Sequence, residues 1–203
     1  MRIKQLLGKG CMILGGIFLL IAALLLLQNA SAERNATNAS NTALAAIAAQ
    51  SSVASNDDSD TTPESNIPNG SDASNITVDG ATYGGVLAIA SLNLSLPIQT
   101  DFSYDNLKSS PCIYTQDDND ALVIAAHNYT AHFGSLPQLS IGDAVTYTTL
   151  DGNTYTYTVS EIVTIEETDL AAIDGSAEEL VLFTCNINDN SQRVVVRCNL
   201  LLL

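Results

Sequence analysis

Positive charge is scarce in this sequence. Its 203 residues include 7 Lys and Arg against 22 Asp and Glu, which gives a net charge of −15 at pH 7. Proteins that bind nucleic acid need a basic face for the phosphates. The composition therefore excludes nucleic acid as a partner, and each of the few cations becomes informative.

Cysteine and histidine are also few. The chain has 4 Cys and 2 His, and that is too few cysteines for a fold of this length built on disulfides. No Cys-x-x-Cys or His-x-x-x-His pair occurs, although zinc sites normally use such local spacing. We therefore predict no metal site of this kind and consider the cysteines and histidines one at a time.

Three of the cations lie at the N-terminus and precede the uncharged apolar run of residues 11–27, CMILGGIFLLIAALLLL. The run is at the short end of what spans a bilayer. The positive-inside rule then predicts a cytoplasmic N-terminus and an extracellular remainder. A signal peptide cleaved near the small residues 30–32 is the alternative. The run is longer than a usual signal-peptide core. We therefore favour the interpretation that residues 1–32 form a cytoplasmic stub and a single-pass signal-anchor.

Residues 33–80 are rich in Ala, Ser, Asn, Asp and Thr and contain no aromatic residue. Such a segment buries too little apolar surface to offset the entropy lost on ordering. We predict a disordered polar linker that acts as a flexible spacer, in which residues 42–54 favour only a transient helix. The folded domain is then expected over residues 81–203.

Alternating apolar residues predict several β-strands in this domain. Asp151-Gly152 is typical of a hairpin turn, because both residues tolerate the backbone that such a turn requires. Strand-like segments lie near residues 83–99, 120–129, 144–149, 155–163, 180–184 and 193–198. Many strands with little helix predict an all-β barrel or sandwich.

Two residues with reactive side chains follow buried strands. Cys185 ends the run 180–184, and a thiolate there would be favoured by nearby cations, although a lone cysteine is more often buried and structural. His127 ends another apolar run, and an imidazole at a strand end can donate and accept protons. His132 lies in the loop beyond, and we expect it to have no chemical part.

Two of the cations follow Cys185. Arg193 opens the next strand, so a hairpin would bring it close to the thiol, and a fixed guanidinium can stabilise a carbonyl oxygen that becomes negative. Arg197 lies on the same face of that strand by alternation. Alternation alone leaves the choice between the two arginines open.

These segments resemble the sortase family. The sequence VLFTC, ending at Cys185, and the arginine that opens RVVVR are similar to its Thr-Leu-x-Thr-Cys strand and downstream Arg. The segment HNYTAHFGSLPQLSIGD resembles its histidine region, and GVLAIASLNLSLPI resembles its opening strand. The resemblance covers residues 83–200. It implies a closed, mostly antiparallel β-barrel with a few short helices, and a membrane-anchored cysteine transpeptidase that attaches surface proteins to the cell wall.

The resemblance also implies roles. Cys185 would attack the carbonyl of an LPXTG-like sorting signal in a surface protein, and His127 would protonate the departing amine. Arg193 fits the arginine of the family best, and Thr184 would support the oxyanion or the substrate. A cell-wall or pilin amine would accept the acyl group. Two residues depart from the pattern of the family: Val181 stands where the family often has Thr, and Ala90 stands where it often has Pro. These departures leave the subclass open.

Other readings are kept beside this one. An exported cysteine peptidase would use the same thiol with water as acceptor, and a surface adhesion module would have no catalysis. Cys112 and Cys198 could form a disulfide outside the cell, provided that their Cα atoms come close enough. No cofactor is expected, although acidic groups could hold calcium: Asp117, Asp118, Asp120, Glu166, Glu167 and Asp169.

Overall fold

The computed structural model describes residues 2–54, 75–116, 121–173 and 179–201. One long helix is followed by β-strands and short 3₁₀ helices. The helices are α1 (Arg2–Ala54), η1 (Ala90–Leu92), η2 (Asn106–Lys108), η3 (Leu136–Gln138) and η4 (Leu170–Ala172). The strands are β1 (Ile76–Val78), β2 (Ala81–Ile89), β3 (Leu94–Gln99), β4 (Cys112–Gln116), β5 (Leu122–Ala125), β6 (Ala144–Thr149), β7 (Thr154–Glu166), β8 (Leu180–Cys185) and β9 (Gln192–Leu200).

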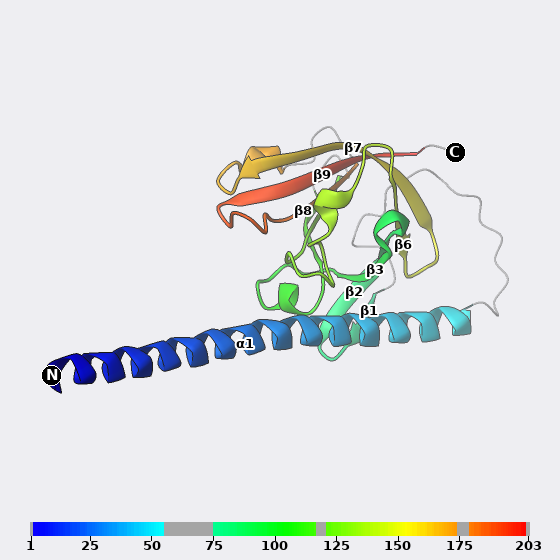
Figure 1. The fold of residues 1–203 in the computed structure, drawn as a ribbon. Helices are drawn as coiled ribbons and strands as arrows, with labels where there is room; N and C mark the ends of the chain where they lie inside the picture. The colour runs from blue at the N-terminus through cyan, green and yellow to red at the C-terminus, as the bar shows by residue number, and fades with distance from the viewer. Residues whose placement is uncertain (1, 55–74, 117–120, 174–178, 202–203) are drawn as a thin grey trace.

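The strands form one sheet that closes on itself. The order is β1-β2-β3-β4-β5-β8-β9-β7-β6, and β2 also pairs with β6, so that eight strands make a barrel and β1 extends its edge. Neighbouring strands are antiparallel except for β3 with β4 and β5 with β8. Figure 1 shows β7, β8 and β9 on the side of the barrel far from α1. The predicted closed, mostly antiparallel β-barrel with a few short helices is confirmed.

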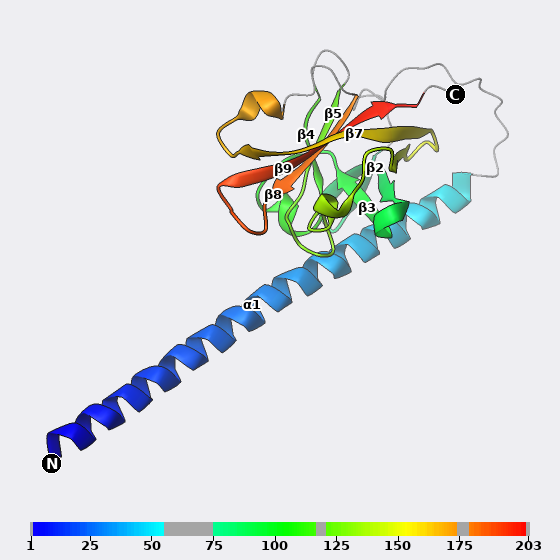
Figure 2. The same ribbon diagram turned by 45° about the horizontal axis from the view of Figure 1, so that its top comes forward.

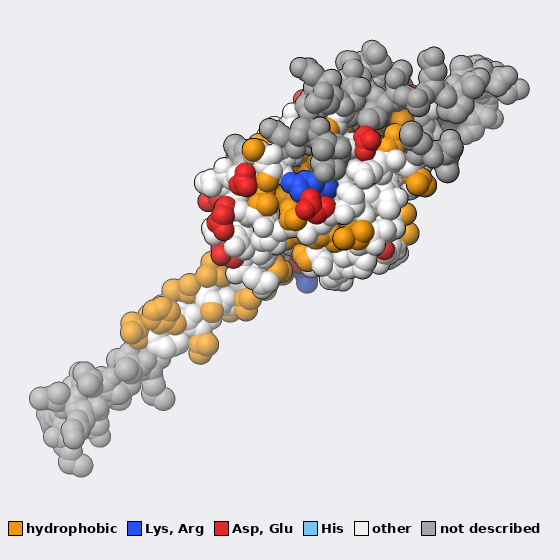
Figure 3. Space-filling view, turned by 90° about the horizontal axis from the view of Figure 1, so that it is seen from above, with side chains coloured by type: hydrophobic (Ala, Val, Ile, Leu, Met, Phe, Trp, Pro, Cys, Tyr) orange, Lys and Arg blue, Asp and Glu red, His pale blue; other side chains and the backbone are white. Residues whose placement is uncertain are grey.

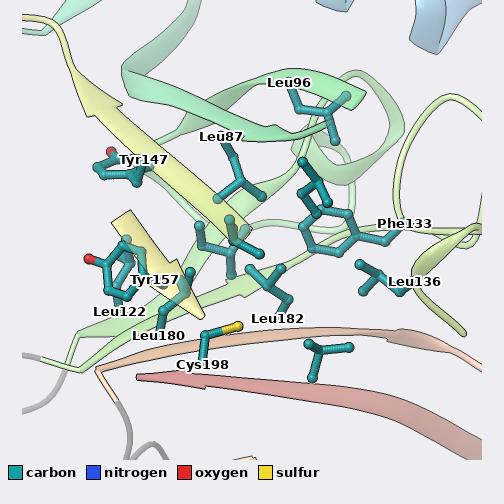
Figure 4. Packing of buried hydrophobic residues seen from close by; sticks show 14 of the residues in the cluster. Leu87, Leu96, Leu122, Phe133, Leu136, Tyr147, Tyr157, Leu180, Leu182 and Cys198 are labelled. Atoms are coloured by element: carbon teal, nitrogen blue, oxygen red, sulfur yellow. The ribbon is translucent and has the colours of Figure 1, made fainter. Parts of the chain in front are cut away.

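Apolar side chains fill the barrel. Leu87 and Leu96 from β2 and β3 meet Leu182 from β8, and Phe133 enters from the loop after β5 (Figure 4). A smaller cluster covers the outer face of the same wall, where Val123, Val181 and Val195 pack with Ile173. Because successive side chains of a strand point to opposite faces, these two clusters show which residues face in and which face out.

Helix α1 differs most from expectation. It continues without a break to Ala54, so the flexible spacer predicted over residues 33–80 is wrong for its first part, and residues 55–74 lie outside the described residues. The stretch Leu14–Ala49 includes a segment long and apolar enough to cross a membrane. Apolar side chains are exposed along α1 beyond the barrel, as Figure 3 shows. The sheet begins at β1, slightly before the predicted start at residue 81, and the barrel itself begins with β2 at Ala81.

The C-terminal half of α1 lies against the barrel because it presents a stripe of small and apolar residues. Ala36, Ser40, Ala43 and Ile47 are buried and follow one another at intervals of four, three and four residues, which places them on one face of the helix. Ala43 and Ile47 pack on Tyr83 of β2. Helix α1 contacts β1, β3 and η2, and Figure 2 shows it passing along the side of the barrel that carries β2 and β3. A helix with such a docked face is held by tertiary packing rather than by its own propensity.

The disulfide considered between Cys112 and Cys198 is wrong, because both thiols are free. Cys112 packs on the outer face of the wall with Leu107 and Ala125. Cys198 belongs to the core inside the barrel (Figure 4). Two cysteines on opposite faces of one sheet point away from each other and cannot be joined without moving the backbone.

The seam between β2 and β6 generates a stability prediction at Gly85. A Cβ at this residue would lie 2.6 Å from the carbonyl oxygen of Thr148 and 2.7 Å from the ring of Tyr147. Gly85→Ala should lower the free energy of unfolding by about 1–3 kcal/mol, because the strands must separate to admit the methyl group. Gly84→Ala is the control, since its Cβ would first meet a Thr100 methyl group at 3.1 Å. Equal midpoints for both variants in urea denaturation would contradict the prediction.

Candidate active site

The parallel pair β5 and β8 brings His127 and Cys185 together. The last paired residues of these two strands are Ala125 and Phe183. His127 and Cys185 each lie two residues further along their own chains, so the register continued by two places them side by side. The chains stay together up to this point, because the amide of Ala126 donates a hydrogen bond to the carbonyl of Phe183 at 3.2 Å.

Thr184 also joins the ends of β5 and β8, from inside the barrel. Its buried hydroxyl donates a hydrogen bond of 2.9 Å to the carbonyl oxygen of Ala126, the residue before His127. A hydroxyl has a single proton to donate, so this bond leaves none for an oxyanion. The side chain of Thr184 therefore fixes the backbone beside His127. The resemblance had implied a different role, support of the oxyanion or of the substrate.

The two chemical side chains share the outer face of the wall. Leu180 and Leu182 of β8 belong to the core, whereas Val181 and Phe183 pack outside it. Alternation then places Cys185 outside as well, and its thiol is partly exposed. On β5 the same argument starts from outward-facing Val123 and Ala125 and reaches His127. A thiol and an imidazole thus lie on the same outer face of the barrel.

Arg193 lies directly across from Cys185. The antiparallel register of β8 and β9 pairs these two residues, and paired residues have Cβ atoms about 4.5–5.5 Å apart on the same face. The guanidinium donates to the carbonyls of Asn190 and Gln192 at 2.8 and 2.9 Å, and it forms an ion pair with Glu167 at 3.0 Å. Its contacts with described residues use three of the five N–H donors of an arginine. The other two make no contact with the described residues.

Arg197 occupies another place on the wall. It is paired with Val181 rather than with Cys185, and four residues of strand separate it from Arg193, about 13 Å along the strand. Its guanidinium forms an ion pair with Glu161 and donates to the carbonyl of Ala172 at 2.7 Å. The register thus places Arg193, and not Arg197, opposite the thiol.

His127 is half-buried, and the burial decides its charge. Desolvation lowers the pKa of His127 below its usual value, and the positive charge of Lys108 lowers it further. Its ring lies 4.8 Å from that of Tyr129, tilted by 33°. The imidazole is therefore neutral at neutral pH and can take a proton from a neighbouring thiol.

His132 was expected to be a loop histidine without consequence, but it is fully buried. Burial lowers the pKa of His132 to about 4, and the nearby His127 contributes in the same direction. Its ring lies 5.5 Å from that of Tyr129, so three rings follow one another through this loop. Sequence reasoning missed this because the loop carries too few apolar residues to indicate burial.

An apolar surface continues from the site. Phe183 lies two residues before Cys185, and its ring meets that of Tyr114 on β4 at 5.1 Å, edge to face. The ring of Tyr114 in turn meets that of Phe102 at 4.9 Å. Together these side chains give the outer face beside the thiol an aromatic floor.

The described residues contain no group of three or more His, Cys, Asp or Glu side chains that could hold a metal ion. Of the acids considered as calcium ligands, Glu166, Glu167 and Asp169 are described. Glu166 and Glu167 contact Gln192 and Arg193 through their carboxylates. Asp117, Asp118 and Asp120 lie outside the described residues.

Solved structures with the same fold are sortases. Sortase A of Listeria monocytogenes is 25% identical, with 59% of this chain and 88% of that chain covered and a TM-score of 0.54. Sortase C of Clostridium perfringens SM101 is 24% identical, with 60% and 71% covered and a TM-score of 0.51. Sortase C1 of GBS pilus island 1 is 22% identical with a TM-score of 0.52, and this chain spans only 64% of its length.

Identities this low show the fold alone, and no curated protein sequence matches the chain. The family is shown by a different comparison. The model of the sortase domain matches residues 87–201, which is more than half of the chain and includes His127, Cys185 and Arg193. This chain therefore belongs to the sortase family.

Proposed function

We propose that the protein is a cysteine transpeptidase that cleaves an LPXTG-like sorting signal and joins the released acyl group to an amine of the cell wall or of a pilin. The observation that carries this proposal is the convergence of His127, Cys185 and Arg193 on one outer face of the barrel. A thiol can act as the nucleophile of an acyl transfer, an imidazole as its acid and base, and a guanidinium as the donor to the oxyanion. The strand registers support this arrangement, because Arg193 pairs with Cys185 and the parallel pairing of β5 with β8 ends two residues before His127 and Cys185.

The first half of the reaction forms an acyl-enzyme. Neutral His127 takes the proton of the Cys185 thiol as sulfur attacks the peptide carbonyl carbon. The carbonyl oxygen becomes negative, and the two N–H donors left on Arg193 stabilise it. When the C–N bond breaks, imidazolium gives its proton to the leaving amine, and the thioester remains on Cys185.

The second half returns the enzyme. An incoming amine attacks the thioester carbon, His127 removes the amine proton, and the proton goes back to sulfur as the C–S bond breaks. One peptide bond is broken and one is formed, so no cofactor or oxidant is needed. The aromatic floor of Phe183 and Tyr114 suits the aliphatic part of a sorting peptide, because apolar pockets with few polar groups are typical of such sites.

The location of the reaction is also part of the proposal. The apolar run in α1 anchors the enzyme in the cell membrane, and the cations before it keep the N-terminus in the cytoplasm. The barrel then lies outside the cell. Product analysis separates this function from that of a peptidase. An added amine should appear covalently attached to the product, and the product of hydrolysis by water should not compete with this amide.

Substitutions at the three residues should divide the reaction. Cys185→Ala should abolish acyl-enzyme formation, because no nucleophile remains. Arg193→Ala should lower kcat by about 100-fold or more, as loss of an oxyanion donor does. Arg197→Ala is the matched control and should lower the melting temperature while keeping most of kcat. A peptide-cleavage assay with each purified variant measures this, and the opposite ranking of the two arginine variants would refute the assignment.

Thiol reactivity should single out Cys185. Burial raises the pKa of Cys112 and of Cys198 to about 12, so at pH 8 only about one in 10⁴ of these groups is a thiolate. A charged methanethiosulfonate reagent should modify Cys185 in the native protein and the other two only after unfolding. Peptide mapping by mass spectrometry reports the sites, and labelling of Cys112 as fast as that of Cys185 would contradict the prediction.

A further inference from the structure

The docked half of α1 begins beside the loop that carries His127. Glu33 lies three residues before buried Ala36, so it belongs to the same face of the helix as the docked stripe. Its carboxylate accepts a hydrogen bond of 3.0 Å from the backbone amide of Thr130. Ser40, two turns further along, donates to the carbonyl of Ser109 at 3.2 Å. The helix is thus tied by polar contacts to two loops of the catalytic domain.

Thr130 is part of a tight turn that starts at His127. The amide of Phe133 donates to the carbonyl of His127 at 3.1 Å, and the amide of Gly134 donates to the carbonyl of Tyr129 at 2.9 Å. A Cβ at Gly134 would lie 2.6 Å from the carbonyl oxygen of Asn128, so the turn leaves no space for a side chain at this position. The two hydrogen bonds close the turn around Thr130 and link its position to that of His127.

The turn is held from two opposite sides. Phe133 is fully buried and anchors the turn in the core of the barrel (Figure 4). On the other side, Thr130 is exposed and faces α1 across a groove that Glu33 and Thr37 also line. The hydrogen bond from the Thr130 amide to Glu33 joins this outer side of the turn to α1.

We propose that α1 is a working part of the catalytic domain, in which Glu33 is a positioning residue that clamps the His127 turn through the amide of Thr130. The inference rests on the proposed function, since it assigns His127 the proton transfers. Without the clamp, the imidazole would sample positions in which it cannot reach both the thiol and the leaving amine. A misplacement of about 1 Å can lower a rate by about 10²-fold.

The test uses the full-length chain in detergent micelles or nanodiscs. Glu33→Ala should lower kcat for acyl transfer by about 10-fold or more, with KM changed little, because substrate binding does not use this turn. Hydrogen exchange of the peptide that covers residues 127–135 should become faster. Glu33→Gln should restore both, because its amide oxygen can accept the same hydrogen bond.

Glu179→Ala is the matched control. The carboxylate of Glu179 also accepts a backbone amide, that of Leu200 at 3.0 Å, but it precedes β8 at the end opposite to Cys185. This variant should leave kcat and the exchange of residues 127–135 unchanged. Melting temperatures of all variants separate a local change from a loss of fold.

The inference is overturned if Glu33→Ala matches the unaltered protein in kcat and in exchange. It is also overturned if Glu33→Gln loses as much activity as Glu33→Ala, since charge rather than the hydrogen bond would then matter. If the unaltered protein transfers no acyl group from any sorting peptide, the proposed function fails instead. The exchange of residues 127–135 in Glu33→Ala would still decide whether the clamp exists.

Discussion

The site depends on the parallel pairing of β5 and β8. Antiparallel neighbours can be joined by a short turn, but a parallel pair needs a long connection, and here the whole β6–β7 hairpin lies between the two strands in the sequence. The hydrogen bond from Thr184 to Ala126 continues the pairing past the last strand residues. A shift of one residue would turn His127 or Cys185 toward the core, so the register itself keeps thiol and imidazole on one face.

Much of this could be predicted from local sequence. The apolar runs that end at His127 and Cys185 show where buried strands stop, because a charged or reactive side chain is costly inside a core. Asp151-Gly152 marks a turn that the structure places between β6 and β7. The position of Arg193 at the start of a strand predicted a place near the thiol. The parallel pairing of these two runs with each other was not predictable, since register is a property of two distant segments.

The failures also have physical reasons. Residues 33–54 resemble a linker because Ala, Ser, Asn and Thr bury little apolar area. Their use is different: small side chains at Ala36 and Ala43 let the helix backbone approach the barrel closely. The disulfide between Cys112 and Cys198 requires both side chains to lie on the same face of the sheet. The spacing of the two cysteines in the sequence does not show which face each one lies on. Burial of His132 depends on the turn that Gly134 permits.

The unbroken course of α1 determines how far the enzyme can reach. Glu33 lies only six positions beyond Leu27, where the apolar run ends, a rise of about 9 Å along the helix. If that run lies in a bilayer, the barrel does not move freely at the end of a flexible linker. The rigid helix instead holds the barrel at a fixed distance from the membrane and in one orientation. A polypeptide would then be selected by whether its motif emerges from the lipid at that height.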